Sequence, residues 1–136
     1  IFKELNNLNY YKLPAPKSLG REWFEKEFKT VLDNYKIPVE DKLATVCKHI
    51  ALQISNSCKK KGIMLVTGGG AHNLFLTEEI KTQFKGSVLI PKKIIVDYKE
   101  ALVFAWLGLL RFLGEENTHH SYTGAKRNSI SGALYL

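Results

Sequence analysis

The stretch that decides the fold reads Ile63-Met64-Leu65-Val66-Thr67-Gly68-Gly69-Gly70-Ala71-His72-Asn73. Its first five residues form an apolar run that favours a buried strand, and a helical pattern opens at Asn73. The three glycines between them let a ligand come close to the backbone, because glycine has no Cβ. The free N–H groups at a helix start favour phosphate oxygens. We therefore predict a nucleotide site over residues 68–73.

The glycine stretch matches neither of two common nucleotide-binding loops. It lacks the Gly-Lys-Ser/Thr that closes a Walker A loop, and Asn73 stands where the Rossmann fingerprint has its third glycine. The next predicted strand is followed by Pro91 rather than by an acid that would hold a ribose. A close-packed turn without a ligand therefore explains the loop, taken by itself, about equally well.

The composition is that of a globular domain with an excess of basic residues. The chain has 136 residues, with 20 Lys and Arg against 13 Asp and Glu, so the formal net charge is +7. This length suits one domain, and we expect a single domain over residues 1–136. The charge would suit an anionic ligand or a nucleic-acid-binding α/β domain. Because the basic residues are scattered and no nucleic-acid motif accompanies them, we expect no nucleic-acid partner.

The two cysteines and the N-terminal sequence indicate the cellular compartment. On one helix, Cys47 and Cys58 would lie ~16 Å apart, so we expect free thiols in a reducing, cytoplasmic compartment. The first residues lack the basic flank and apolar core of a signal peptide. The only methionine is Met64, so we also expect that this sequence is a piece of a longer chain.

The rest of the pattern alternates between helices and short strands. Helices are predicted over residues 21–35, 40–60, 74–84 and 98–113, and strands over residues 63–67, 87–90 and 94–96. Residues 13–20 and 114–127 read as irregular, and residues 1–11 carry no clear pattern. Alternation of this kind predicts an α/β layer with a small parallel sheet.

The helix over residues 98–113 is apolar on all sides, which predicts a buried core helix. Crossing a bilayer takes about 20 apolar residues, so we expect no membrane partner. Its first-turn Glu100 has two readings: it offsets the positive end of the helix, or it accepts a hydrogen bond from a ligand hydroxyl. Position alone favours the first. His49 reads as a packing residue, and His119 and His120 as loop histidines, so no metal site is predicted.

Three blocks together resemble one family, the anhydro-N-acetylmuramic acid kinases. They are Pro-Lys-Ser-Leu-Gly-Arg-Glu at residues 16–22, Thr-Gly-Gly-Gly-Ala-His-Asn at 67–73 and Glu-Ala-Leu-Val-Phe-Ala-Trp-Leu at 100–107, with a weaker match at residues 122–125. The resemblance covers about residues 13–135. Two positions depart from the family pattern: His72 stands where many members carry arginine, and Leu19 replaces a commoner threonine.

The resemblance implies a fold and an activity. That family belongs to the actin, hexokinase and Hsp70-like ATPases, so we expect a partial ribonuclease H-like α/β domain. Its enzymes use ATP, Mg²⁺ and water to open the ring of 1,6-anhydro-N-acetylmuramic acid and phosphorylate O6 in peptidoglycan recycling. A non-catalytic ATP-binding or assembly module of the same fold is the alternative. The resemblance leaves a homodimer open.

The resemblance also assigns residues. Gly68, Gly69 and Gly70 would lie against the adenosine and its nearer phosphate, with Asn73 beside them, and Glu100 would line the sugar site. Lys17 and Arg21 match family positions without an assigned role. The family's phosphate loops and catalytic base lie before the first matching block, so the expected chain is the C-terminal, ATP-binding portion of a two-domain sugar kinase. We assign it no catalytic residue and expect it to have no kinase activity alone.

Overall fold

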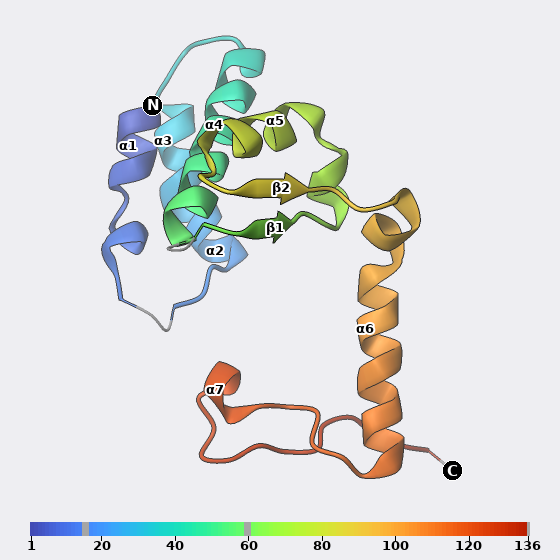
Figure 1. Ribbon diagram of the computed structural model, residues 1–136. Coiled ribbons are helices and arrows are strands. Elements are labelled where there is room, and N and C mark those ends of the chain that lie inside the picture. Colours follow the sequence, from blue (N-terminus) through green and yellow to red (C-terminus); the bar gives the residue numbers. More distant parts are fainter. Residues whose placement is uncertain (15–16, 59–60, 136) are drawn as a thin grey trace. The chain divides into compact units, whose positions relative to one another are not determined.

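The computed structural model describes residues 1–14, 17–58 and 61–135, and these divide into two compact units. The first unit comprises Ile1–Val66 and Gly70–Ile90. The second comprises Thr67–Gly69 and Pro91–Leu136. The expected α/β class is confirmed, because the first unit combines packed helices with a two-stranded parallel sheet (Figure 1).

The sheet of the first unit consists of β1 (Ile63–Leu65) and β2 (Ser87–Leu89), which pair in parallel with Met64 opposite Val88. Parallel neighbours need a crossover connection, and α5 (Leu74–Gln83) supplies it. The pairing extends past the strand ends, since the Val66 N–H donates to the Leu89 carbonyl at 2.9 Å. The predicted strands over residues 63–67 and 87–90 and the helix over 74–84 are thus confirmed, each slightly shorter.

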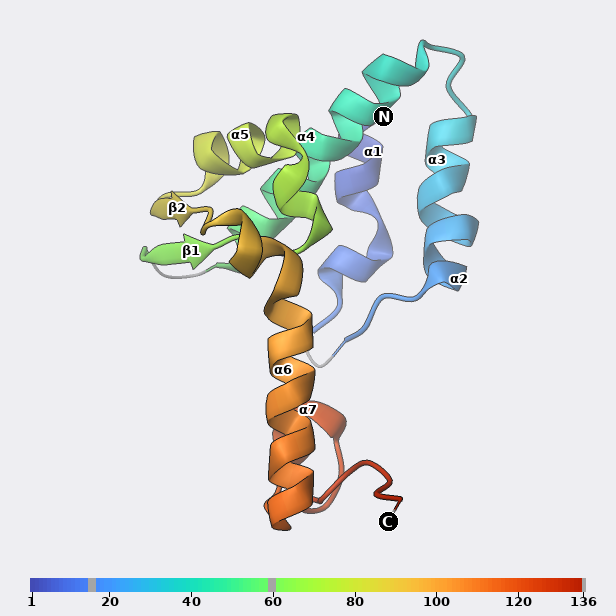
Figure 2. The same cartoon turned by 90° about the vertical axis from the view of Figure 1, so that its right-hand side faces the viewer.

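The prediction that the first strand is buried was wrong. Ile63 and Leu65 are 77% and 54% exposed, whereas Met64 between them is half-buried. Figures 1 and 2 show the two strands side by side with α5 next to them. Alternating exposure is the pattern of a strand with one covered face. Only one face of β1 is therefore covered, whereas its apolar sequence suggested that both faces would be.

The helices of the first unit gather around α4 (Val39–Ser57). Both views place α1 (Phe2–Asn7) and α3 (Lys29–Asp33) on the side of α4 away from the strands (Figure 2). The remaining elements are the 3-10 helix η1 (Asn9–Lys12), α2 (Arg21–Trp23) and the π-helix η2 (Phe24–Phe28). Neither α1 nor η1 was predicted, because the polarity of that segment is mixed.

Two helix predictions need adjustment. The predicted helix over residues 21–35 is present as α2, η2 and α3. Its middle part, η2, is a π-helix, which apolar spacing does not reveal. The helix predicted to run to Lys60 ends at Ser57, and Cys58 is extended. Lys59 and Lys60 lie outside the described residues, as does Pro16 of the first family block. Both cysteines are free thiols, as expected.

A buried polar network joins α1 and η1 to α4. His49 is 1% exposed, and its Nδ1 lies 2.8 Å from the Asn6 Oδ1. Because that amide oxygen is an acceptor only, His49 Nδ1–H donates, and Nε2 accepts from the Tyr11 hydroxyl at 2.8 Å. Gln53 Nε2 also donates to the Asn6 Oδ1. The expectation that His49 packs is confirmed, and the network requires a neutral imidazole.

The second unit is built on α6 (Lys93–Leu113), which Gly114 ends in the left-handed conformation at φ 75°. After it come α7 (His120–Thr123) and an antiparallel bridge between Thr118 and Ser129. Asn117 ties the C-terminal tail to α6: its Nδ2 donates to the carbonyls of Leu107 at 3.2 Å and Ser131 at 3.0 Å. The predicted irregular stretch over residues 114–127 is confirmed apart from α7.

Two predictions for this region were wrong. Residues 94–96 are helical rather than extended, because α6 begins at Lys93, where a Lys93–Asp97 ion pair spans its first turn. A three-residue apolar run does not separate strand from helix. The helix is also not buried: Val96 is its buried residue, while Leu102 and Phe104 are 67% and 71% exposed. Within the described part of the chain, no helix has the length and apolar character to cross a membrane.

Acid should weaken the fold through His49. Burial lowers the pKa of its imidazole from 6.5 to about 4. Between those values the unfolded chain binds a proton that the folded chain does not, so stability is full above about pH 6.5 and falls towards pH 4, by up to about 3 kcal/mol. We expect His49→Gln to lose less unfolding free energy than wild type between pH 7 and pH 4.5, measured by urea denaturation. The exposed-loop variant His119→Gln should keep the wild-type pH dependence. If the free energy of unfolding of His49→Gln fell with acid as much as that of the wild type, the role given to His49 would be contradicted.

Gly86 should tolerate no side chain. A Cβ there would lie 2.2 Å from the Gly62 carbonyl oxygen and 2.7 Å from the Phe84 Cε1. We expect Gly86→Ala to lower the free energy of unfolding by about 1–3 kcal/mol, because the start of β2 must move away from Gly62. The matched control is Gly62→Ala, whose Cβ meets no atom within 4 Å and should change stability by less than about 0.5 kcal/mol. Equal thermal stability of the two variants would rule out this packing.

Candidate functional site

The predicted strand–turn–helix is present at the carboxyl end of β1. Gly68 adopts φ +79°, a left-handed conformation that favours glycine, and its N–H donates to the Val96 carbonyl at 3.2 Å. The chain then forms a 3-10 turn, η3 (Gly69–His72), in which Ala71 is buried. Asn73 follows as the N-cap of α5. The local order inferred from the sequence is therefore confirmed.

The space around the glycines separates the two readings of the loop. An added Cβ would meet no atom within 4 Å at Gly69, and at Gly70 only the Leu76 Cδ2 at 4.0 Å. Both glycines are exposed. Close packing within the chain therefore does not explain the absence of side chains at these two positions. What the glycines provide is bare main chain that another molecule can approach.

Asn73 has a defined structural task. Its side-chain Oδ1 accepts a hydrogen bond from the Leu76 N–H at 3.0 Å, which satisfies one of the free donors in the first turn of α5. Its Nδ2 lies 3.8 Å from the Cys47 Sγ on α4. The Asn73 side chain thus holds the start of α5 in place, and the remaining first-turn N–H groups point away from the helix body.

Glu100 lies elsewhere on its helix than the sequence suggested. Because α6 starts at Lys93, Glu100 lies beyond the first turn and does not offset the helix N-terminus, so the reading favoured by position was wrong. The carboxylate is exposed. Among the described residues of the second unit, none forms a hydrogen bond or ion pair with it. A solvent-facing acid without an internal partner is free to accept hydrogen bonds from a ligand.

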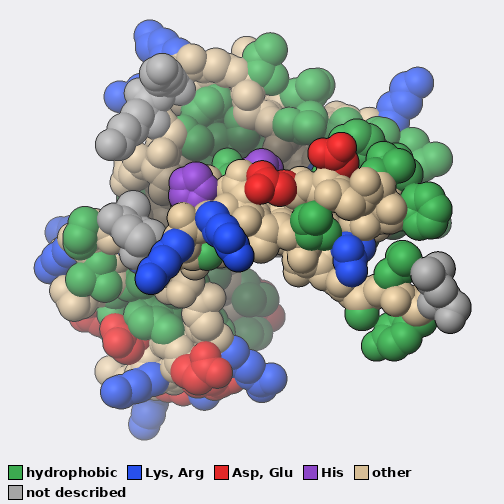
Figure 3. Space-filling view, turned by 90° about the horizontal axis from the view of Figure 1, so that it is seen from below, with side chains coloured by type: hydrophobic (Ala, Val, Ile, Leu, Met, Phe, Trp, Pro, Cys, Tyr) green, Lys and Arg blue, Asp and Glu red, His purple; other side chains and the backbone are tan. Residues whose placement is uncertain are grey.

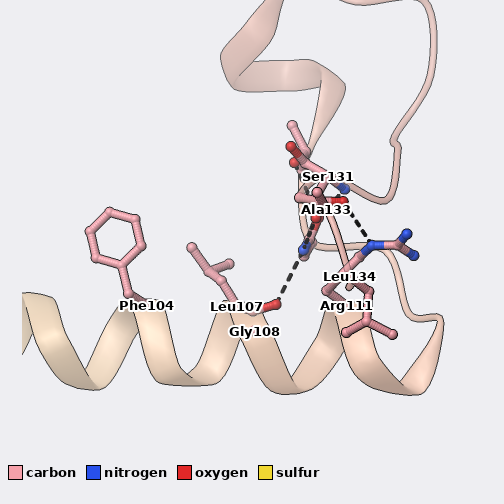
Figure 4. A pocket seen from close by; sticks show the side chains of 10 residues that line it. Phe104, Leu107, Gly108, Arg111, Ser131, Ala133 and Leu134 are labelled. Carbon is pink, nitrogen blue, oxygen red and sulfur yellow. Dashed lines mark hydrogen bonds between the residues drawn. The ribbon is translucent and has the colours of Figure 1, made fainter. Parts of the chain in front are cut away.

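A hollow continues along the Glu100 side of α6. Phe104, Leu107 and Arg111 follow Glu100 at four, seven and eleven residues, which places all four on one helical face. These three side chains, with Asn117 and residues of the tail, line a hollow of about 370 Å³. Figure 4 shows Phe104 and Leu107 projecting from the same side of α6, with Ser131 and Ala133 above the helix end. This spacing is present in the sequence, but because the helix is apolar on all sides, the spacing did not single out this face.

The predicted site residues are divided between the two units. Gly68, Gly69 and Glu100 belong to the second unit, whereas Gly70 and Asn73 belong to the first. Lys17 and Arg21, which had no assigned role, make local contacts. Lys17 Nζ donates to the Tyr10 carbonyl at 2.9 Å, and Arg21 pairs with Glu25 at 3.5 Å.

Comparison with known proteins adds the family. The model of the family described as anhydro-N-acetylmuramic acid kinase matches residues 1–136, the whole of the sequence. The chain belongs to the anhydro-N-acetylmuramic acid kinase family. An anhydro-N-acetylmuramic acid kinase of Vibrio parahaemolyticus is 34% identical over 135 residues, which is 93% of this chain and 36% of that protein. The family resemblance seen in the sequence is thereby confirmed.

Other members of the anhydro-N-acetylmuramic acid kinase family give the same picture. The Aliivibrio fischeri protein of that name is 31% identical over 148 residues, covering 99% of this chain and 39% of its own length. The Saccharophagus degradans protein is 30% identical over 135 residues. This chain therefore spans little more than a third of the length of these curated relatives. In the described part of the chain, no three His, Cys, Asp or Glu side chains come together as a metal site.

The cap at Asn73 gives a direct stability test of the loop. We expect Asn73→Ala to lower the free energy of unfolding by about 0.5–2 kcal/mol, because the Leu76 N–H loses its acceptor. Asn73→Ser, which keeps a capping oxygen, should retain most of the wild-type stability. Urea denaturation followed by circular dichroism measures both. If alanine and serine were equally stable, the side chain of Asn73 would have no capping role.

Proposed function

We propose that this chain is the nucleotide-binding part of an ATP-dependent kinase that hydrolyses and phosphorylates 1,6-anhydro-N-acetylmuramic acid. One observation carries the proposal. In this member of the family Gly69 and Gly70 are exposed, and the packing of the chain itself gives no reason for glycine at these two positions. They lie between a parallel strand and the start of a helix. In open α/β sheets, ligands bind beyond the carboxyl ends of the strands, where this turn lies.

The loop residues fit a nucleotide in distinct ways. The bare main chain of Gly69 and Gly70 accommodates the flat face of an adenosine, which a side chain would hold away. The N-terminal turn of α5 attracts a phosphate through its free N–H groups and its dipole. Gly68 has a supporting role, because its N–H is already bonded to the Val96 carbonyl. Asn73 likewise acts by fixing the helix start.

Glu100 is the proposed contact to the sugar. Its ionised carboxylate accepts hydrogen bonds only, and the hydroxyl groups of a sugar are donors that suit it. Phe104, one turn further along α6, lies on the same face and opens onto the hollow beside the tail. A sugar bound at Glu100 would therefore have a concave surface next to it.

The remaining chemistry is assigned to no residue of this chain. Phosphoryl transfer needs positioning, a metal ion and a base that activates the attacking oxygen. ATP would supply the phosphoryl group and Mg²⁺ would neutralise its charge, but the described residues offer the metal no ligand cluster. We place this chain in the C-terminal portion of a two-domain, cytoplasmic kinase of partial ribonuclease H-like fold, which acts by closing on its other half.

A second candidate function is a non-catalytic ATP-binding or assembly module of the same fold. The exposed Gly69 and Gly70 are compatible with it, because accessible main chain serves binding without chemistry equally well. The two functions differ in the rest of the polypeptide: an aspartate base and phosphate loops there indicate the kinase. A nucleic-acid function has little support, because Figure 3 shows the lysines and arginines scattered over the visible face.

Nucleotide binding should depend on Gly69 while stability does not. We expect isothermal titration calorimetry to show saturable binding of ADP to the wild-type chain. Gly69→Ala should weaken binding about tenfold or more, since the added methyl occupies the space of the adenosine. Its melting temperature should stay at the wild-type value, because that methyl meets no atom of the chain within 4 Å.

Gly62→Ala is the matched control, since its Cβ also meets no atom within 4 Å and it lies outside the loop. This control should bind ADP as the wild type does. Equal ADP affinity in Gly69→Ala and wild type would contradict the proposal. So would an absence of saturable binding by a folded wild-type chain.

A further inference from the structure

We propose that the hollow between α6 and the C-terminal tail is a carboxylate-binding site in which Arg111 contacts the ligand. The ligand class is a small carboxylic acid with one negative charge and an apolar side. All the residues that line the hollow belong to the second unit. That the carboxylate is part of an acidic sugar rests on the proposed function, whereas the binding chemistry itself does not.

Arg111 is the only charged residue among the described residues that line the hollow. It is half-buried, and its Nε donates to the Gly132 carbonyl at 2.9 Å. A guanidinium has five N–H donors, so those on its two terminal nitrogens have no partner among the described residues. None of the described acids pairs with Arg111, including Glu115 just beyond the end of α6. A half-buried positive charge without a counter-charge favours the binding of an anion.

The tail holds this guanidinium in a defined place. Gly132 adopts φ +101°, a left-handed conformation that favours glycine, and its carbonyl accepts the bond from Arg111. The neighbouring Ser131 is fixed by the Asn117 side chain, which accepts from the Ser131 N–H at 2.7 Å and donates to its carbonyl at 3.0 Å. Figure 4 shows the bond from Arg111 to the tail. A guanidinium that is already held loses little side-chain entropy when a ligand binds.

Shape and charge favour a carboxylate over other anions. A planar guanidinium binds the two oxygens of a carboxylate through two parallel N–H···O bonds. Phe104, Leu107 and Leu134 contribute apolar walls to the hollow. A phosphate monoester carries about −1.5 to −2 charges at neutral pH, which one arginine among apolar walls compensates poorly. The volume of about 370 Å³ lies in the range of small-molecule sites.

Such a carboxylate has two sources, an acidic sugar or a free carboxylic acid. The relatives are kinases of anhydro-N-acetylmuramic acid, and muramic acid is an amino sugar that carries a lactic acid group as an ether. Glu100 lies on the same face of α6, ~16 Å along the helix axis from Arg111. Hydroxyl groups suit Glu100, and a carboxylate suits Arg111. An acidic sugar that reached both side chains would therefore bind in one orientation.

Side-chain NMR of the nitrogen-15-labelled chain tests the site. The Nε–H signals of the three arginines are followed during titration with D-lactate at constant ionic strength. D-lactamide, the neutral amide, is the matched ligand control. We expect lactate to shift the Arg111 signal and the Gly132 amide in a saturable way, and lactamide to shift neither. Arg21 and Arg127, which are both exposed, should show no saturable shift.

A pair of substitutions separates Arg111 from the general charge of the chain. Arg111→Gln should raise the Kd for lactate about tenfold or more, because the two-bond contact is lost. Arg127→Gln removes the same charge from an exposed position and should leave that Kd unchanged. Equal lactate affinity in Arg111→Gln and wild type would overturn the proposal.

The comparison of ligands needs no substitution, so it decides the matter if Arg111→Gln disturbs folding. A folded wild-type chain whose Arg111 signal does not respond to lactate would overturn the proposal. So would lactamide binding as tightly as lactate, since the carboxylate would then have no role. Tighter binding of inorganic phosphate than of lactate at Arg111 would overturn the ligand class.

Two sugars distinguish the sources of the carboxylate. If the acidic sugar is the ligand, 1,6-anhydro-N-acetylmuramic acid should shift Arg111 and bind about tenfold more tightly than lactate. Glu100→Gln should weaken that binding, and 1,6-anhydro-N-acetylglucosamine, which lacks the lactic acid group, should leave Arg111 unshifted. Lactate binding without a response to the acidic sugar would exclude the sugar as the source. A chain that binds lactate but not ADP would contradict the proposed nucleotide site and support this one.

Discussion

The parallel pairing of β1 with β2 is the constraint on which the rest of the first unit depends. Parallel neighbours are joined only through a crossover, so the chain must leave β1, turn, and return through α5. The bond from the Val66 N–H to the Leu89 carbonyl holds the end of β1 in register. The turn that follows is thereby fixed at the carboxyl edge of the sheet, with Gly69 and Gly70 exposed on it. Position and bare main chain together make this turn the proposed nucleotide site.

The second unit is organised around α6 and the tail that folds back against it. One side of α6 carries Glu100 and the open hollow that the tail helps to line, and the Asn117 amide fastens this tail to α6. Large apolar side chains of α6 are exposed on more than one side of the helix, among them Leu102, Phe104 and Phe112. The chain covers little more than a third of the length of its curated relatives.

Local features of the fold could be predicted from the sequence, and burial could not. The order of strand, turn and helix and the helix start at Asn73 depend on neighbouring residues, and both were found where expected. The exposure of Ile63 and Leu102 depends on what packs against them from far along the chain, which apolar spacing does not report. The start of α6 was misplaced because residues 94–96 form too short a run to show a period. Because of that error, Glu100 was expected in the first turn of the helix, whereas it lies beyond that turn.

The most direct test of the account is amide mapping of the nucleotide site. Nitrogen-15 spectra of the labelled chain are recorded during titration with ADP, and each amide shift is assigned to its residue. The account predicts that the largest shifts fall on Gly69, Gly70 and the first turn of α5. Largest shifts at a site remote from this turn, such as the network around His49, would contradict it.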